Sequence, residues 1–534
     1  MTYRRNTFLF LIIFLHLLNH SLSCQFKNIQ VNNSSANQPN EVSIAINPKN
    51  PNFISAGSNL NLFYSSSDGG NTWTQKLMSS VWKVWGDPCL IYDTNGNLFF
   101  AHLSDQRNTG TGYWIDRIVV QRSTSNGASW DYDVGVGFSP PSKQQDKEWL
   151  CADYSNSIYR NNLYLAWTEF DKYGSTNASD HSRILFSRST NSGASWSNPV
   201  KISDNEGDCI DDDNTMEGAV PCSGPNGEVY ISWAGPYGIQ FDKSTNGGVT
   251  FSNDIHVANL NAGWVFDIPG INRANGFPVT ACDISNSPYR GNIYINWSDQ
   301  INGDTDIFFS KSTDGGNTWS LPLKVNNDLL PRHQFFNWMT VDPVTGKIYI
   351  IFYDRRDNLD PNSTQTHVYI ARSDDGGNSF KNIRISETPF FPLNTVFFGD
   401  YTNIAAYNGK IYPIWMRMDG NKMSVWNSVI DDSQFLTSVN YRKDHLPEVT
   451  NLFQNYPNPF NPGTTINFQV EKETYVNLKV YDIIGNEIAT LVNEIKKPGS
   501  YNVSFDGGNF SSGIYLYRLV TPEHHISKKM ILTK

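Results

Sequence analysis

The chain has 534 residues, of which 13% are aromatic and only 17% are charged, and its formal net charge at pH 7 is −10. This length allows a large core and more than one domain, and the aromatic content argues against a helical or disordered chain. The acidic balance argues against nucleic acid as the main partner and fits neutral or polar ligands, or bound cations.

Residues 1–24 have the pattern of a secretory signal peptide. Arg4 and Arg5 precede an apolar run from Phe8 to Leu18, and a short polar segment ends at Cys24. The run is too short for a good membrane span, and no later stretch could form one. We therefore expect an exported mature chain without a transmembrane segment. Lipidation of Cys24 is an alternative.

An eight-residue box, S-x-[DNS]-x-G-x-x-[WF], recurs between strand-like runs in the first three quarters of the chain. Its clearest copy is Ser312–Trp319. The glycines supply positive φ, the Asp or Asn side chain can bond turn N–H groups, and the aromatic residue can pack beneath, so each box predicts a hairpin connection. The six copies begin at Ser66, Ser123, Ser189, Ser244, Ser312 and Ser373. Such recurrence predicts a radial or stacked all-β repeat fold.

The strand-like runs group into seven units. The seventh, from Gly399 to Ser428, lacks a box and a fourth strand, whereas Phe26–Asn32 resembles the fourth strands of other units. Pairing that segment with the seventh unit would close a ring and remove exposed sheet edges. We therefore predict an all-β chain with a seven-bladed β-propeller over residues 25–431. Six blades is the alternative.

The composition changes after the predicted propeller. We assign residues 432–452 to a linker and residues 453–534 to a final domain, which starts with the proline-rich run Tyr456–Pro462. Short alternating strands separated by turn signals predict a small Ig-like β-sandwich there.

Acidic residues stand at the starts of several predicted first strands. Alignment of the repeats places Glu41, Asp87 and Asp400 at equivalent positions in neighbouring units, with Glu217 one residue off. Converging carboxylates need a cation, a shared proton or a catalytic role, and a paired acid and base is what glycoside hydrolysis requires. Backbone hydrogen bonding between blades is the structural alternative. We carry the four residues forward as catalytic candidates.

Long loops expected on the same face carry aromatic and basic residues. Aromatic platforms beside charged groups suit sugar rings. The candidate substrate-binding residues are Trp85, Trp114, Arg273, Arg332, His333, Trp338 and Arg355.

An acidic loop before the fourth unit is a candidate calcium site. Asp208, Asp211 and Asp213 offer the oxygen ligands that calcium prefers, without the order of an EF-hand. Cys209 and Cys222 flank part of this loop, and since export permits disulfides, we predict that they pair.

The boxes resemble the Asp-box, or BNR, repeats of the sialidase superfamily, over about three quarters of the chain. This resemblance implies a propeller whose boxes are structural and lie on the rim away from the active face. Family sialidases have a Phe/Tyr-Arg-Ile-Pro motif in the first blade, where this chain has Asn40–Ser43. Their arginine triad has no residue-by-residue counterpart here.

The C-terminal segment closely resembles the type IX secretion sorting domain of Bacteroidetes-type bacteria. The resemblance rests on Asn455–Pro462, Val480–Gly485 and Ser512–Arg518. It implies export across the outer membrane by the type IX machinery and a secreted or cell-surface location.

Two main hypotheses of function remain open at this point. One is a carbohydrate-directed glycoside hydrolase, sialidase-like, acting on extracellular glycans or glycoproteins. The other is a non-catalytic scaffold or adhesin that binds glycans or proteins. A polysaccharide lyase with His333 and Arg332 is a third possibility. Calcium is the cofactor that the sequence suggests, and no cofactor is required by it.

Overall fold

The computed structural model describes residues 26–33, 38–107, 113–139, 143–301, 303–328, 331–358, 360, 362–437, 449–455 and 457–534. The predicted signal peptide lies outside the described residues. The chain divides into two compact units, Met1–Phe435 and Leu436–Lys534.

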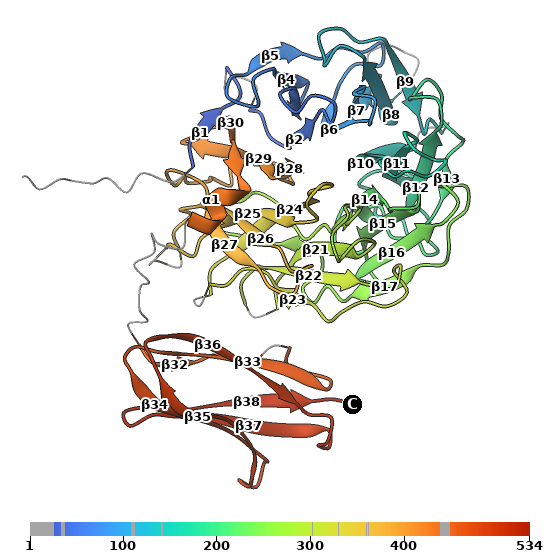
Figure 1. Ribbon diagram of the computed structural model, residues 1–534. Helices are drawn as coiled ribbons and strands as arrows, with labels where there is room; N and C mark the ends of the chain where they lie inside the picture. Colours follow the sequence, from blue (N-terminus) through green and yellow to red (C-terminus); the bar gives the residue numbers. More distant parts are fainter. Residues whose placement is uncertain are drawn as a thin grey trace, which may run out of the picture. The chain divides into compact units, whose positions relative to one another are not determined.

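The described part of the first unit forms seven antiparallel sheets built on four strands each (Figure 1). The first three are β2 (Ser43–Ile46), β3 (Ile54–Ser58), β4 (Leu62–Ser66) and β5 (Thr74–Leu77); β6 (Gly86–Tyr92), β7 (Leu98–Asp105), β8 (Trp114–Ser123) and β9 (Tyr132–Val136); and β10 (Gln144–Ala152), β11 (Leu163–Phe170), β12 (Ser182–Ser189) and β13 (Val200–Lys201). The next three are β14 (Glu217–Ser223), β15 (Val229–Ala234), β16 (Ile239–Ser244) and β17 (Ile255–Ala258); β20 (Val279–Cys282), β21 (Ile293–Asp299), β22 (Asp306–Ser312) and β23 (Leu323–Lys324); and β24 (Gln334–Val341), β25 (Ile348–Asp354), β26 (His367–Ser373) and β27 (Lys381–Arg384).

The last sheet is completed from the other end of the chain. It contains β28 (Asn403–Tyr407), β29 (Lys410–Asp419), β30 (Lys422–Ser428) and β1 (Asn28–Gln30), with the short β31 (Ile430–Asp431) beside β29. β1 pairs antiparallel with β30, and the side chain of Asn32 accepts a 2.8 Å hydrogen bond from the N–H of Val425. The predicted pairing of Phe26–Asn32 with the last repeat is therefore confirmed.

The sheets follow one another around a ring in the manner of a β-propeller, and the ring is closed (Figure 1). The first strand of each sheet contacts the first strand of the next, and β28 of the last sheet contacts β2 of the first. A small hairpin of β18 (Val265–Phe266) and β19 (Ala274–Asn275) is inserted before the fifth sheet. The second strands are covered on both faces, which explains why β25, with the sequence IYIIFYD, is buried along its whole length.

The boxes form the predicted hairpin turns. In Ser312–Trp319, Asp314 Oδ1 accepts the N–H groups of Asn317 and Thr318 at 3.0 Å each, and Ser312 Oγ accepts the N–H of Gly316 at 2.9 Å. Gly315 and Gly316 have φ values of 73° and 82°, which a side chain would disfavour. The carboxylate thus replaces the backbone acceptors that a tight turn cannot supply.

Each box also contacts the preceding sheet. The ring of Trp319 packs edge-to-face on Phe241 of the fourth sheet, with centroids 5.0 Å apart. Lys243 of the same strand, β16, donates to the carbonyl of Gly315 at 2.8 Å and to Asn317 at 2.7 Å. Similar basic side chains reach the next box from Lys76, Arg188 and Lys311. The boxes therefore join neighbouring sheets at the periphery.

The last sheet has no box, and the short helix α1 (Asp432–Thr437) contacts the sixth sheet instead. Asp432 forms ion pairs with Arg372, at 2.6 Å, and with Lys347, and it accepts the hydroxyl of Tyr349 at 2.7 Å. Burial opposes ionisation, but Arg372 and Lys347 outweigh it and lower the pKa of Asp432 to about 2. This helix lies at the start of the segment that the sequence assigns to the linker.

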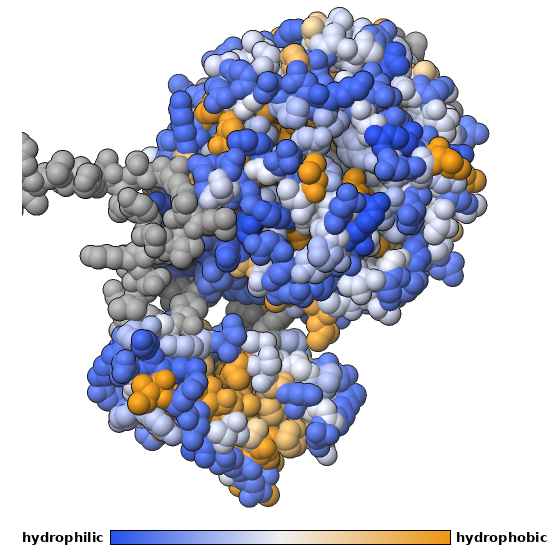
Figure 2. All heavy atoms as spheres, in the orientation of Figure 1, coloured by the Kyte–Doolittle hydropathy of each residue, from blue (hydrophilic) through white to orange (hydrophobic). Residues whose placement is uncertain are grey.

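The second unit contains two antiparallel sheets over one core. The sheets are β32 (Asn451–Leu452), β33 (Gly463–Val470) and β36 (Gly499–Asp506), and β34 (Thr474–Tyr481), β35 (Glu487–Lys496), β37 (Gly513–Val520) and β38 (His525–Leu532). Phe468 of the first sheet and Leu478 and Tyr517 of the second belong to the same core. The four-stranded sheet exposes apolar side chains, among them Ile495 and Ile514. Figure 2 shows hydrophobic atoms at the surface of this unit.

The predicted disulfide is absent. Cys209 and Cys222 are free thiols. Cys209 forms an isolated backbone β-bridge with Ser175 in the loop region before β14. Cys222 lies near the far end of β14, opposite Tyr230 of β15. The strand β14 thus separates Cys222, near its far end, from Cys209 in the loop before it, and the two side chains do not meet as a disulfide requires. Of the residues that the structure describes, none forms an apolar helix of the length that a bilayer requires.

Replacing Asp432 tests the contact of α1 with the ring. Asp432→Asn leaves the buried Arg372 with one ion-pair partner, the half-exposed Asp374, and we expect the free energy of unfolding to fall by about 3 kcal/mol at neutral pH. Because the pKa of Asp432 is lowered, the wild-type contribution is present above the unfolded pKa and is lost as the pH falls toward about 2.

The measurement is urea unfolding of the full chain at several pH values. Asp374→Asn removes the exposed partner of the same arginine and is the matched control, with an expected cost of at most about 1 kcal/mol. Equal losses in both variants would contradict a structural role for Asp432.

Candidate functional site

The strand starts around the central channel share an unusual backbone conformation. Glu41, Asp87 and Lys147 all have φ near +51°, and Phe336 has a φ of 53°. In three of the four cases the residue lies at a bulge in the pairing of the first two strands. A left-handed conformation at a residue other than glycine costs about 1 kcal/mol or more and is retained only where the surroundings impose it. Since Phe336 shares it, the conformation belongs to the architecture.

This conformation corrects the alignment of the strand starts. Lys147 occupies the position of Glu41 and Asp87 in the third sheet. In the last sheet the left-handed residue is Gly399, with a φ of 94°, so Asp400 is displaced by one position. The acidic residues are nevertheless brought together, because the side chain of Lys147 lies between them.

Lys147 joins the three predicted carboxylates. Its Nζ lies 3.5 Å from Glu41 Oε1 and 3.4 Å from Asp87 Oδ2, and it forms a close ion pair with Asp400. Burial alone would lower the pKa of Lys147, but Asp400, Asp87 and Glu41 outweigh it and raise that pKa. The lysine side chain is only 8% exposed, so the cluster is a largely desolvated set of charges.

Arg273 is the second cation of the cluster. Its Nε donates to Asp400 Oδ1 at 3.1 Å, and its Nη1 donates to Asp211 Oδ2 at 2.9 Å. Burial favours the neutral form of Asp400, but Arg273 and Lys147 outweigh it and hold the pKa of this carboxyl well below its usual range. Asp400 is therefore a buried anion that positions both cations.

The pKa values of Glu41 and Asp146 are raised, in contrast to that of Asp400. Burial, reinforced by the nearby Asp87, raises the pKa of Glu41 well above its ordinary value, and a hydrogen bond between these two carboxyl groups contributes. Asn59 connects the pair further, since its Oδ1 accepts the N–H of Asp87 at 2.7 Å and its amide nitrogen donates to Glu41. Burial and Asp87 also raise the pKa of Asp146 to about 7. Burial thus favours the protonated form of Glu41, and Asp146 changes charge near neutral pH.

These groups face a cavity of about 360 Å³, which is in the range of small-ligand sites. Of the predicted residues, it contains Glu41, Asp87, Trp85, Trp114 and Arg273. Its remaining lining residues are Gln38, Asn40, Asn59, Leu60, Leu103, Asp146, Lys147, Tyr173 and Phe397.

Aromatic side chains form one wall of this cavity. Trp85 and Trp114 meet edge-to-face with centroids 6.2 Å apart, and Trp114 meets Tyr173 in the same way at 5.3 Å. The guanidinium of Arg107 lies over the ring of Trp85, 4.6 Å from its centroid. The hydroxyl of Tyr173 donates to Asp211 at 2.5 Å. One wall is therefore apolar and the facing groups are charged.

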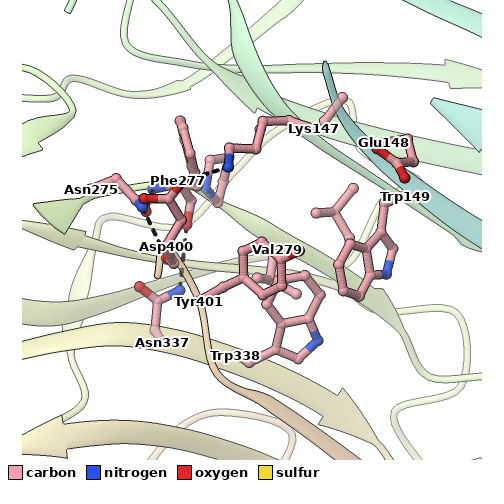
Figure 3. Close-up of a pocket in the computed structure, with 14 residues that line it drawn as sticks. Lys147, Glu148, Trp149, Asn275, Phe277, Val279, Asn337, Trp338, Asp400 and Tyr401 are labelled. Atoms are coloured by element: carbon pink, nitrogen blue, oxygen red, sulfur yellow. Dashed lines mark hydrogen bonds and ion pairs between the residues drawn. The ribbon is translucent and has the colours of Figure 1, made fainter. Parts of the chain in front are cut away.

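A second, small cavity of about 30 Å³ lies deeper in the channel (Figure 3). Figure 3 shows Lys147 and Asp400 pointing toward each other beside the rings of Trp338 and Tyr401. Trp338 packs against Trp149 with centroids 4.2 Å apart. The predicted substrate residue Trp338 thus lies in the floor of the channel, outside the lining of the larger cavity.

Glu217 is buried at the start of β14. Burial, with Asp211 and Asp146 nearby, raises its pKa well above the ordinary value, and its Oε2 has no hydrogen-bond partner. It does not line the larger cavity. Glu217 is thus a neutral acid next to the cluster.

Three predicted substrate residues lie elsewhere. The N–H of Arg355 donates to the carbonyl of His333 at 3.1 Å, and the Arg355 guanidinium lies over Phe335. Arg332 donates to the carbonyl of Asn358 at 3.0 Å. Burial and the nearby Arg355 and Arg332 lower the pKa of His333 to about 4. Neither cavity described above is lined by Arg332, His333 or Arg355.

The acidic loop predicted to bind calcium directs its carboxylates to different partners. Asp208 accepts the hydroxyl of Thr215 at 2.9 Å, and Asp213 accepts the N–H groups of Trp264 and Val265 at 2.8 and 2.9 Å. Asp211 belongs to the channel cluster through Arg273. Within the described residues, the structure does not gather these three into a possible metal-ligand set.

Sequence reasoning missed Asp146, Lys147, Asp211 and Tyr173 as members of the channel site. Lys147 precedes Trp149 by two residues, as Phe336 precedes Trp338, and this spacing to aromatic residues that pack together in the channel could have pointed to it. No local signal marks Tyr173 or Asp211, because they reach the site from long loops.

Comparisons with solved structures find other chains at low similarity. A Hadza microbial sialidase is 12% identical, with a TM-score of 0.40 over 71% of this chain and 73% of that one. An α-L-arabinofuranosidase from Fusarium graminearum is 13% identical, with a TM-score of 0.43 over 77% of this chain and 98% of that one. The sialidase of Trypanosoma rangeli is 12% identical, with a TM-score of 0.40 and 86% coverage of both chains. Such distant likeness carries no argument about activity.

No curated protein matches the chain. The C-terminal unit, in contrast, has a clear relationship. Residues 454–533 match the secretion system C-terminal sorting domain, as the tail motifs predict. The chain therefore carries a C-terminal export signal and is a secreted or cell-surface protein.

Proposed function

We propose that this protein is an exported glycoside hydrolase whose active site is the cavity at the mouth of the propeller channel. We further infer that its seven sheets are the seven blades of the ring and that its C-terminal sandwich is Ig-like. The observation that carries the proposal is that three carboxyl groups, Glu41, Asp87 and Asp146, line one cavity beside the Lys147 ammonium, and that the pKa of Asp146 is raised to about 7. Glycoside hydrolysis uses one protonated carboxyl and one carboxylate across the scissile bond, and environments that separate their pKa values supply both.

Asp146 is the proposed general acid. It faces the cavity, and a pKa of about 7 keeps a useful fraction protonated at neutral pH while allowing proton transfer. Asp87, from the adjacent sheet, is the proposed carboxylate that acts as base or nucleophile. Its hydrogen-bonded partner Glu41 and the Lys147 ammonium stabilise the negative charge that it carries.

The remaining groups position these two acids. Asp400 holds Lys147 and Arg273, and Trp85 and Trp114 offer apolar faces on which the C–H groups of a sugar ring can pack. Both cations are already paired with carboxylates. We therefore propose a neutral glycoside as substrate, because the carboxylate of an acidic sugar would meet an excess of negative charge.

A non-catalytic, glycan-binding scaffold is the competing function. It would leave the strand-start carboxylates bonded to backbone N–H groups on an open face. Here they bond to the side chains of Lys147, Arg273 and Asn59 beside a cavity, which favours the hydrolase.

The Asp146→Asn variant tests the assignment of the acid. We expect kcat on the best neutral aryl or oligosaccharide glycoside to fall by about a hundredfold or more, because proton donation to the leaving group is lost. The melting temperature should not fall, since the wild-type carboxyl is buried without a cation in direct contact. The measurement is a hydrolysis screen of neutral glycosides and sialosides with the full chain.

Asp267→Asn, an exposed residue on the insertion hairpin, is the control and should leave both kcat and melting temperature unchanged. Wild-type protein that turns over no glycoside, or an Asp146→Asn variant with full activity, would overturn the proposal. Faster hydrolysis of sialosides than of neutral glycosides would refute the substrate class.

The pH dependence provides a second test. Because the folded pKa of Asp146 is raised to about 7, the acid form is present below that pH, and kcat/KM should fall as the pH rises through about 7. The stability of the fold should change in the same direction. The contribution of Asp146 to the free energy of unfolding is greatest below its unfolded pKa and is lost as the pH rises through its folded pKa.

Urea unfolding checks the stability side of this prediction. The Asp146→Asn variant should exceed the wild type in stability at about pH 8, and the difference should shrink toward about pH 4. A constant difference across that range would show that Asp146 has an ordinary proton affinity in the folded chain.

A further inference from the structure

Three buried aspartates meet in the fifth sheet, outside both cavities described above. Asp304 and Asp306 lie at the start of β22, and Asp328 lies in the segment after β23. One carboxylate oxygen of each residue lies within 4.8 Å of the corresponding oxygens of the other two. Asp304 is 6% exposed, Asp306 is fully buried, and the side chain of Asp328 is 2% exposed. We call these residues the β22 aspartate cluster.

The protein groups around the cluster satisfy only half of its oxygens. Lys324 Nζ lies 2.7 Å from Asp306 Oδ1 and 3.7 Å from Asp328 Oδ1, and Asn326 Nδ2 donates to the same two oxygens at 2.8 and 2.5 Å. The Oδ2 atoms of Asp304, Asp306 and Asp328 are all buried and have no hydrogen-bond partner. One ammonium therefore faces three carboxylates, and an unpartnered oxygen of each is withdrawn from water.

We propose that the β22 aspartate cluster binds a calcium ion. Hard carboxylate oxygens at this density suit Ca²⁺, which accepts six to eight oxygen ligands in a flexible geometry, better than Mg²⁺, which demands a near-ideal octahedron. The absence of a sulfur or nitrogen ligand in the cluster disfavours zinc. An exported protein can use a weak site, because extracellular calcium modules bind in the 10⁻⁴–10⁻³ M range. This site is distinct from the Asp208–Asp213 loop.

The cation would join two segments that are separated along the chain by β22 and β23 but lie side by side in the fold. Asp304 and Asp306 flank Thr305, whose N–H donates to His333 Nδ1 at 3.2 Å and whose carbonyl accepts the N–H of Gln334 at 2.7 Å. Asp328 comes shortly before His333 and Gln334 in the chain. Calcium at the cluster therefore fixes the start of β22 to the chain that leads into β24, and its expected effect is on stability.

Calcium titration of the full chain tests the proposal. After EGTA treatment and gel filtration, isothermal titration with CaCl₂ should show one site. Free calcium at about a hundred times Kd should raise the melting temperature by about 3 °C. Asp306→Asn should weaken calcium binding by at least about tenfold, since it removes the charge of one ligand. Asp208→Asn, in the acidic loop, is the control and should bind calcium like the wild type.

A second variant separates a cation site from a purely structural ion-pair cluster, and it decides the matter if Asp306→Asn does not fold. Lys324→Gln keeps all three carboxylates and removes the ammonium that competes with the ion. It should melt below the wild type in EGTA, recover in calcium and bind calcium more tightly. The proposal is overturned if the wild type binds no calcium, if Asp208→Asn is the variant that loses it, or if calcium fails to restore Lys324→Gln.

Discussion

The ion pairs of Lys147 allow carboxylates from three sheets to occupy one small volume. Glu41, Asp87 and Asp400 come from the first, second and last sheets, and each is held by the same buried ammonium. Without a central cation, three anions at this range would repel one another and would each lose water without compensation. With it, the cluster becomes asymmetric: Asp400 is fixed as an anion, whereas Glu41 retains a proton. The chemistry that we propose depends on that asymmetry.

The periphery of the ring provides the rigidity that such a cluster needs. A carboxylate, amide or hydroxyl acceptor fixes the shape of each box, and in four boxes a lysine or arginine from the preceding sheet fixes its place. The last sheet lacks a box, and there Asp432 of α1 forms ion pairs with Arg372 and Lys347 of the sixth sheet. The left-handed strand starts can therefore persist in the channel, because they are over-determined by contacts made at the rim.

The part of this structure that follows from local sequence was predictable. The boxes specify their own turns through glycine conformation and a short polar acceptor, so strand content and repeat order could be read directly. The resemblance of Phe26–Asn32 to other fourth strands identified the partner of β30. The convergence of Glu41, Asp87 and Asp400 followed from the repeats as well.

What failed depends on contacts between distant loops. The sequence does not show which residues of the long loops reach the channel, so Tyr173 and Asp211 were missed. The proximity of Cys209 and Cys222 along the chain concealed that β14 lies between them. Lys147 was missed because nothing in its own sequence shows that its side chain lies between acids from three sheets.

The pairing of β1 with β30 means that the ring can close only after almost the whole repeat region has been synthesised. The segment nearest the N-terminus is the first to leave the ribosome, yet its partner strand lies about 400 residues later, as the Asn28–Ser428 pair shows. Until that later strand is available, β1 has no neighbour in its sheet, and loop closure over such a separation is slow. A nascent or partly translocated chain therefore cannot seal the ring. A closed ring therefore means that the whole repeat region up to β30 has been made, whereas the C-terminal unit with its export signal follows later in the chain.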